Sequence, residues 1–309
     1  MRALGRLARL ILPARGMAAL ASSSDSALLA SPRTTDPLFR RIEEVHAARG
    51  ARYGHILDAG TGGHSLKWLA RLPAGGVASV TAVTADASAG EGKGAADLRH
   101  LLDAARGDAL AEGKWCVPGA APALAVEKFD TVLVDYLVGS MDGFTPFAQD
   151  VFFDELAAYC APSALVHVVG LAPIYTSLGG GYGSLSPAEK VVVDVARARD
   201  ACILLAGHRP YREFPADWII RHLKKSGFRL VGDGTWKSYG VVWKHATAKK
   251  QIDVARRKLP HFDDRDVAAA MAAKLDALDA AAAALLGEKG VVYGHDYVIS
   301  AERAAAPES

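Results

Sequence analysis

The stretch Ile56-Leu57-Asp58-Ala59-Gly60-Thr61-Gly62-Gly63 decides the fold class. It begins with apolar residues typical of a buried strand and breaks into glycine, and the residues from 65 to 72 then have helical character. The pattern predicts a strand, a tight loop and a helix. Asp58 places a carboxylate at the carboxyl end of this strand, and Gly60 and Gly62 let a ligand approach the backbone of the turn closely.

Strands and helices alternate on both sides of this stretch. Apolar periodicity predicts helices over 36–49, 95–105, 148–159 and 188–206, and strands over 77–84, 129–135 and 164–171. Near-continuous apolar strands are typical of parallel sheets, whose helical crossovers cover both faces. We therefore expect an α/β fold with a doubly wound, mostly parallel sheet of seven strands.

The pattern changes in the last third of the chain. After a helix expected over 217–226, the strand candidates 227–236 and 238–245 are too close together for a crossover helix, so we expect them to pair antiparallel. An alanine-rich helix over 263–286 and an apolar stretch over 291–299 follow. The expected division is a segment 1–37, an α/β domain 38–246 and a helical appendage 247–309.

Composition excludes several classes of protein. The 309 residues are 50% hydrophobic and 23% charged, which is enough apolar material for a large core and unlike a disordered chain or a disulfide mini-protein. A formal net charge of +2, without a long run of one sign, gives no nucleic-acid footprint. The three cysteines lack metal-ligand spacing, so we expect buried thiols. No apolar run approaches the roughly 20 residues that span a bilayer.

The first 37 residues have the composition of an organelle transit peptide. Arg2, Arg6 and Arg9 share one face of a helix at about 100° per residue, and no acid precedes Asp25. We expect a mitochondrial presequence. A plastid transit peptide and an ordinary frayed helix are the alternatives.

The glycine stretch resembles the first motif of the class I S-adenosylmethionine-dependent methyltransferases, an apolar strand followed by an acid, one residue, Gly, one residue and Gly. The strand 129–135, which ends in the acid Asp135, and the expected reversed strands near the end of the domain are similar to this family as well. Ser65 stands where the dinucleotide fingerprint has its third glycine, which disfavours NAD. The resemblance covers residues 38–246 and implies S-adenosylmethionine as the cofactor.

The resemblance also implies which residues contact the cofactor. They are Asp58, Gly60, Gly62, Asp86, Asp108 and Asp135. Asp86 follows the second strand, where the family binds the ribose hydroxyls, and Asp108 matches the position near the adenine. In the alternative interpretation the glycines only form a tight turn and the acids cap helices.

Two later segments are candidates for the acceptor pocket. They contain Tyr136 and Asp142 after the fourth predicted strand, and His208, Arg209, Tyr211 and Arg212 after the fifth. Tyr136 and His208 are the candidate catalytic residues, since the pKa of histidine lies near neutrality. Arg209 and Arg212 can bind a carboxylate or phosphate. The alternative is a surface connection that caps the preceding helix.

Other polar residues have more than one interpretation. His64, beside the glycine turn, either serves the site or only begins a helix, whereas His167, inside an apolar strand, is expected in the core. His295 and Asp296 are expected to serve packing or a dimer contact, because one His-Asp pair lacks the further ligands that a metal requires. We expect no metal. The segment 170–183 is either a lid over the acceptor or a plain connector.

The leading hypothesis is a methyltransferase that uses S-adenosylmethionine on a small-molecule acceptor by in-line methyl transfer. Its expected partners are that acceptor and, through the appendage, a second copy of the chain in a homodimer, without nucleic acid. One alternative is a non-catalytic organellar assembly factor that keeps the same fold. A nucleotide-dependent oxidoreductase is disfavoured by the spacing of the glycine turn.

Overall fold

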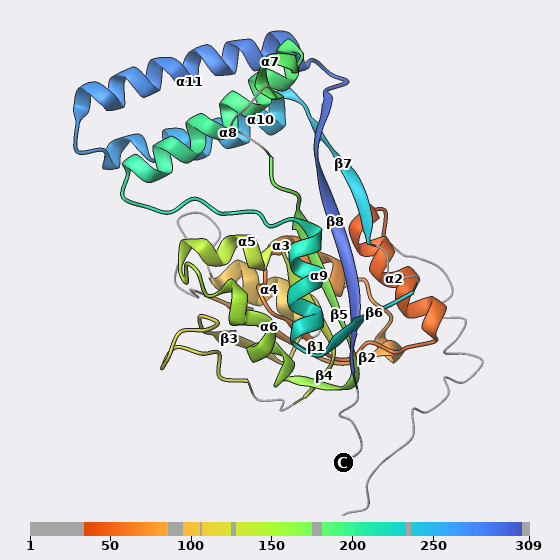
Figure 1. Ribbon diagram of the computed structural model, residues 1–309. Helices are drawn as coiled ribbons and strands as arrows, with labels where there is room; N and C mark the ends of the chain where they lie inside the picture. The colour runs from red at the N-terminus through yellow and green to blue at the C-terminus, as the bar shows by residue number, and fades with distance from the viewer. Residues whose placement is uncertain are drawn as a thin grey trace, which may run out of the picture.

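The strand of the glycine stretch, β1 (Gly54–Asp58), lies inside an eight-stranded sheet (Figure 1). The computed structural model describes residues 34–85, 95–105, 107–124, 128–174, 181–232 and 236–304. Five strands run parallel in the order β3-β2-β1-β4-β5. The four parallel strands besides β1 are β2 (Val77–Thr84), β3 (Ala109–Glu112), β4 (Phe129–Asp135) and β5 (Cys160–Leu171). The expected α/β class is confirmed.

Strand β8 (Val291–Arg303) is reversed relative to its neighbours and completes the sheet. One edge of β8 pairs with β5, and its other edge pairs with β6 (Phe228–Leu230) and then with β7 (Lys237–Trp243). Because β6 and β7 share one position, eight strands occupy seven positions.

The expected pairing of 227–236 with 238–245 is therefore wrong. Both strands run antiparallel to β8 and lie one after the other along its edge, so each pairs with β8 and not with the other. The expected boundary at residue 246 also needs correction, because the segment 247–309 supplies β8 to the sheet as well as helices.

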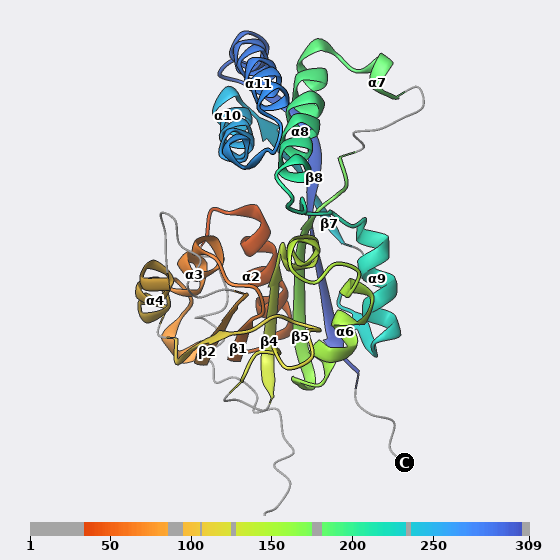
Figure 2. The same ribbon diagram turned by 90° about the vertical axis from the view of Figure 1, so that its left-hand side faces the viewer.

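Helices cover both faces of the sheet (Figure 2). The helices on one face are α2 (Pro37–Arg49), α3 (Gly63–Leu69) and α4 (Ala95–Ala104), and those on the other are α6 (Gln149–Ala157) and α9 (Ala216–Lys225). Phe39 and Leu66 pack against Ile56 in the first apolar cluster. Phe152 and Ile219 belong to the second, with Val166. The two clusters make the strands apolar on both sides, as parallel strands require.

A layer of three helices stands over the carboxyl edge of the sheet (Figures 1 and 2). It consists of α8 (Pro187–Leu205), α10 (His245–Arg256) and α11 (Arg265–Leu286). These helices share an apolar cluster that includes Val192, Ile252 and Leu275. The sequence pattern did not predict α10, because two of its three buried residues are alanines. None of the described helices is both long and apolar enough to cross a membrane.

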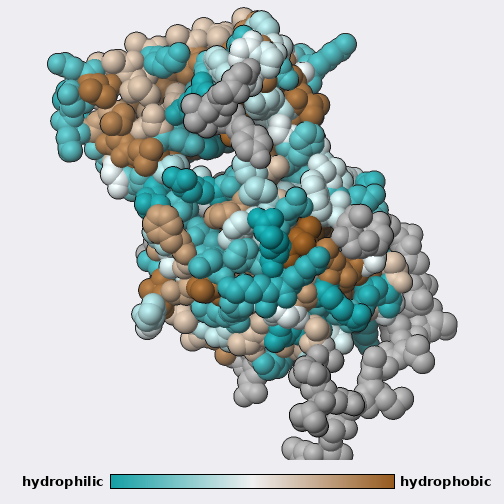
Figure 3. Space-filling view, viewed as in Figure 1, coloured by the Kyte–Doolittle hydropathy of each residue, from teal (hydrophilic) through white to brown (hydrophobic). Residues whose placement is uncertain are grey.

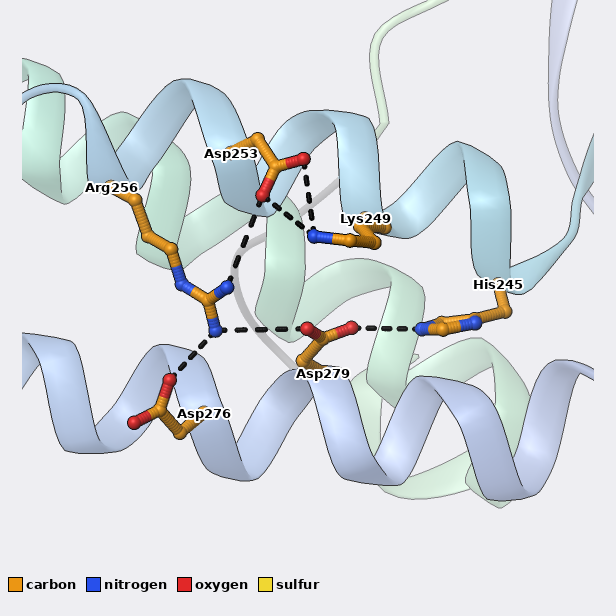
Figure 4. A network of polar contacts seen from close by, with 6 residues as sticks. All are labelled: His245, Lys249, Asp253, Arg256, Asp276 and Asp279. Atoms are coloured by element: carbon orange, nitrogen blue, oxygen red, sulfur yellow. Dashed lines mark hydrogen bonds and ion pairs between the residues drawn. The ribbon is translucent and has the colours of Figure 1, made fainter.

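Polar contacts also join α10 to α11 (Figure 4). His245 Nε2 lies 2.8 Å from Asp279 Oδ1, and Arg256 Nη2 lies 2.7 Å from Asp276 Oδ1. The hydrogen bond from His245 lowers the pKa of Asp279. Exposed ion pairs contribute little to stability because water already solvates both partners. The apolar cluster is therefore expected to hold the layer together.

A pair of substitutions compares the contributions of the apolar cluster and of the polar network to stability. Leu275→Ala removes a fully buried side chain and should lower the free energy of unfolding by about 2–5 kcal/mol. Asp279→Asn disrupts the polar network and should cost less than about 1 kcal/mol. Urea unfolding of both variants measures the difference, and an equal or larger cost for Asp279→Asn would contradict the dominance of the apolar cluster.

Two buried histidines connect α2 to the centre of the sheet. His46 Nε2 lies 3.1 Å from His167 Nε2, and His167 Nδ1 lies 2.9 Å from Ser300 Oγ. The other ring nitrogen of His46 lies 3.1 Å from the carbonyl oxygen of Ala51. Burial lowers the pKa of His46 to about 4 and the pKa of His167 well below its usual value. Both rings are neutral in the folded protein, and His167 is a core residue as expected.

This pair makes the fold sensitive to acid. The unfolded chain takes up a proton at His46 below about pH 6.5, whereas the folded chain resists it down to about pH 4. The stability difference between wild type and His46→Gln should therefore change by on the order of 3 kcal/mol, to the disadvantage of wild type, as the pH falls through that window. Urea unfolding between pH 4 and 8 measures it. His100→Gln, at an exposed position, is the control, and parallel curves for wild type and His46→Gln would contradict the assignment.

Candidate functional site

The turn after β1 is held between the two neighbouring strands. The Ala59 amide donates to Leu133 of β4 at 2.9 Å, and the Thr61 amide donates to Val83 of β2 at 2.7 Å. A Cβ at Gly60 would lie 2.8 Å from the Leu137 side chain, so this position must be glycine. A Cβ at Gly62 would meet no atom within 4 Å. Gly60 therefore serves packing, and Gly62 faces open space.

The two glycines can be separated by experiment. Gly60→Ala should lower the free energy of unfolding by about 1–3 kcal/mol, because the added methyl group overpacks the turn against Leu137. Gly62→Ala should leave stability close to wild type and serves as the matched control. Thermal or urea unfolding measures both, and a Gly60→Ala protein as stable as wild type would contradict the packing role.

A cavity of about 180 Å³ opens beside this turn, where ligands of open α/β sheets bind. Its lining includes Gly60 and Thr61 of the turn, the end of β2, Trp115 after β3, and Leu137 after β4. The indole of Trp115 is buried and donates to the Ala59 carbonyl at 2.6 Å. Trp115 lies in the stretch 110–122, whose weak periodicity gave no signal for it. We call this cavity the turn cavity.

Several buried oxygen atoms near the turn have no hydrogen-bond partner among the described residues. Asp58 Oδ2 accepts from Ser65 at 2.7 Å, whereas Asp58 Oδ1, although near Thr61, has no well-formed hydrogen bond. Thr61 Oγ1 and Asp135 Oδ1 are also unpartnered. Burial raises the pKa of Asp58 to about 7. Since buried polar atoms are normally paired, these oxygens indicate a place for a ligand that donates hydrogen bonds.

His64 connects the start of α2 to the end of β4. Its Nε2 lies 2.9 Å from Asp36 Oδ2, and its Nδ1 lies 3.5 Å from Asp135 Oδ2. Hydrogen bonding to Asp135 raises the pKa of His64 to about 9. His64 is therefore charged at neutral pH and balances part of the negative charge at this edge.

A second cavity, of about 710 Å³, lies between the sheet edge and the helical layer, and we call it the interlayer cavity. Figure 3 shows the surface hollowed between these two parts of the molecule. The polar residues of its lining include Tyr136, Glu213 and Asp296, and the apolar ones include Phe214 and Trp243. Tyr136 follows Asp135 directly and has a left-handed backbone (φ +51°), which is unusual for a bulky residue. Tyr136 places the interlayer cavity next to the end of β4.

The interlayer cavity contains carboxyl groups with perturbed pKa values. Burial raises the pKa of Glu213 to about 7 and also raises the pKa of Asp296. The Tyr136 hydroxyl hydrogen-bonds to Asp296, and burial raises the pKa of this phenol as well. Such perturbation in a cavity is typical of functional sites. The expected packing role therefore does not fully explain Asp296, which also lies in the wall of this cavity.

The structure does not bring Asp108 to the turn cavity. Asp108 precedes β3, so it lies at the amino end of that strand, and its Oδ2 accepts from the Val80 amide at 3.2 Å. The expectation failed because the sequence pattern did not locate β3, whose carboxyl end leads to Gly113 and Trp115 instead. Asp86, predicted to bind ribose, lies outside the described residues.

The arginines predicted to bind an acceptor are joined to Asp142 instead. Arg209 donates to the Asp142 carboxylate through Nη2 at 3.1 Å and to its carbonyl through Nε at 3.1 Å. Arg212 Nε lies 3.6 Å from the same carboxylate. Asp142 is buried, so these contacts fix the segment after α8 against the end of β4. Neither Asp142 nor Arg209 lines the interlayer cavity.

The candidate residues of that segment also differ in whether they line the interlayer cavity. Tyr211 and Arg212 line the interlayer cavity, at its exposed side. His208 is exposed, does not line the cavity, and has its ring 6.0 Å from that of His261. The structure therefore gives no geometric support to His208 as a general base. Sequence reasoning missed Glu213, whose burial depends on residues distant in the chain.

The order β3-β2-β1-β4-β5-β8-β6 contains the expected parallel strands and the expected glycine turn after β1, together with the reversed strand β8, whose place in the sheet was not expected. The chain thus has a doubly wound α/β fold with a mostly parallel sheet. No protein-family model and no curated protein sequence matches the chain.

The chain resembles several solved structures at low sequence identity, and three of them are as follows. A candidate methyltransferase from Bacillus halodurans has a TM-score of 0.45 and 14% identity, covering 85% of this chain and 98% of its own. The YcgJ protein from Bacillus subtilis has a TM-score of 0.46 and 13% identity, covering 85% and 97%. Mycolic acid cyclopropane synthase CmaA1, complexed with SAH and CTAB, has a TM-score of 0.45 and 11% identity, covering 91% and 94%.

Proposed function

We propose that this chain is a methyltransferase that uses S-adenosylmethionine to methylate a small-molecule acceptor. The observation that carries the proposal is the juxtaposition of two cavities at the carboxyl edge of the sheet. The turn cavity is lined by Gly60 and Thr61 after β1, and the interlayer cavity includes Tyr136 directly after β4. The unpartnered oxygens of Asp58 and Asp135 lie at the ends of the same two strands, outside the lining of the turn cavity. One cavity suits a cofactor and the other an acceptor.

Residues at the ends of β1 and β4 fit the donor groups of S-adenosylmethionine, although they lie outside the lining of the turn cavity. Its ammonium group can donate to the unpartnered oxygens of Asp58 and Asp135, and the open space at Gly62 leaves room beside the turn. Asp86, just beyond β2, is the residue that the sequence predicts for the ribose hydroxyls. When bound, the cofactor supplies an electrophilic methyl group on a sulfonium.

The contribution of the chain itself is alignment and exclusion of water. Methyl transfer by in-line displacement depends mainly on the relative position of acceptor and methyl group. Tyr136, fixed by its left-handed backbone, lies in the lining of the interlayer cavity and directly follows the acid of the turn site. Residues of the helical layer, among them Ala196 and Gln251, complete the wall of that cavity. Residues on both layers therefore enclose the acceptor.

A second candidate function is a non-catalytic assembly factor with the same fold. The observation that favours it is the loss of the predicted acceptor pocket, since Asp142 engages the two arginines and His208 is exposed. Mitochondrial targeting by residues 1–37, or plastid targeting as the alternative, stays a proposal, and residues 1–33 lie outside the described ones. A homodimer through α11, where Val267 and Leu285 are exposed, is also a proposal.

Calorimetric titration distinguishes the two functions. The protein should bind S-adenosylmethionine and S-adenosylhomocysteine with micromolar affinity and should not bind NAD. Asp135→Asn should weaken binding of both sulfur compounds by about tenfold, because a charge-assisted hydrogen bond to the ammonium group becomes a neutral one.

Two controls accompany that titration. Asp263→Asn, at an exposed position before α11, should bind like wild type, and His208→Ala should leave cofactor binding unchanged. Failure of wild type to bind either sulfur compound would overturn the methyltransferase proposal and favour the assembly factor.

A further inference from the structure

The interlayer cavity contains two carboxyl groups that have no ion-pair partner among the described residues. Glu213 lies in the connection from α8 to α9, and Asp296 lies on β8, so the fold brings them together from distant parts of the chain. Burial raises the pKa of both groups, repulsion from Asp296 adds to the effect at Glu213, and repulsion from Asp135 adds to it at Asp296. Partial burial of two like charges is unfavourable unless a cation balances them.

Close packing fixes the position of Glu213. The Leu171 amide hydrogen-bonds to its carboxylate. A Cβ at Gly139 would lie 2.7 Å from Glu213 Oε2, so the absence of a side chain at Gly139 makes room for this carboxylate. Asp296 is fixed by the pairing of β8 with Leu171 on one edge and Tyr239 on the other. Both groups are therefore presented by rigid backbone.

The arginines of the lining are already engaged. Arg199 Nη2 lies 2.7 Å from Asp200 Oδ1, and its Nη1 donates to Gln251 at 2.8 Å. Arg212 is directed to Asp142 and is mostly exposed. Arg199 stabilises the charged form of Glu213, although burial outweighs this effect. An anionic ligand would thus find no uncommitted cation, whereas a cationic ligand would find two carboxylates.

Much of the remaining wall is apolar or aromatic, beside the polar residues Thr247 and Gln251. Leu171, Ile174, Phe214 and Trp243 contribute to it, and the volume of about 710 Å³ falls in the range typical of small-molecule sites. An apolar body is therefore favoured beside the cationic group. Asp200 is a third carboxylate of the lining, and it is paired with Arg199.

We propose that the interlayer cavity binds an amine carried on an apolar or aromatic body, with its ammonium group between Glu213 and Asp296. This inference rests on the proposed function in one respect: in a methyltransferase the bound amine is the methyl acceptor. It thereby names the class of acceptor. Binding of the amine is a property of the chain itself. It can be measured with or without cofactor.

Three ligands of matched shape test the charge preference. The full-length protein is titrated by calorimetry with phenethylamine, 2-phenylethanol and phenylacetate, each with and without S-adenosylhomocysteine. Phenethylamine should bind at least about tenfold more tightly than the alcohol, and phenylacetate should bind most weakly. Equal affinities for amine and alcohol, a preference for phenylacetate, or no binding of any of the three would each overturn the proposal.

Two variants test whether the two carboxylates cause the preference for the amine over the alcohol. Glu213→Gln and Asp296→Asn should each remove most of the advantage of the amine over the alcohol while leaving the affinity for 2-phenylethanol unchanged. Glu288→Gln, at an exposed turn, is the matched control. A folded Glu213→Gln protein that keeps the full preference would overturn the role of Glu213, and circular dichroism verifies folding. Loss of S-adenosylhomocysteine binding with amine binding retained would instead refute the proposed function alone.

Discussion

The antiparallel pairing of β8 with β5 is the interaction on which the rest of the structure depends. It completes the sheet, gives β6 and β7 an edge to pair with, and extends toward the helical layer. The same strand provides Ser300 to the buried histidine pair and Asp296 to the interlayer cavity. Core stability and site geometry are therefore linked through one strand.

Several acidic residues lie at the carboxyl edge of the sheet in buried or partly buried positions. Asp58, Glu213 and Asp296 all have raised pKa values, chiefly because burial disfavours their charged forms. His64 is the cation that the structure places against Asp135. Such an arrangement costs folding free energy, and proteins tolerate it mainly where a ligand supplies the missing partners. The fold around it is otherwise regular, with apolar clusters on both faces of the sheet.

Local sequence patterns were enough to predict the strands of the parallel part that have strong periodicity. The bounds of β2 and β4 agree with the expected 77–84 and 129–135, because apolar runs and flanking turn residues mark them. β3 is short, and its weak pattern led to the wrong position for Asp108. The partner of β6 and β7 was not predictable either, since periodicity shows which face of a strand is buried and not which distant edge it meets. For the same reason Gly60 and Gly62 were found from sequence, whereas Glu213 and Trp115 were not.

The position of β8 has a consequence for how the chain folds. It is the last strand of the described sheet to leave the ribosome, yet it lies between β5 and the β6 and β7 edge. Until it is made, the edges of β5, β6 and β7 that it covers have unpaired backbone groups, which are available to other chains. Contacts between residues as distant in the sequence as Leu165 and Glu302 also slow folding, because long segments of chain must come together before these contacts form. Protection of the growing chain, by chaperones for example, is therefore most needed until β8 has left the ribosome.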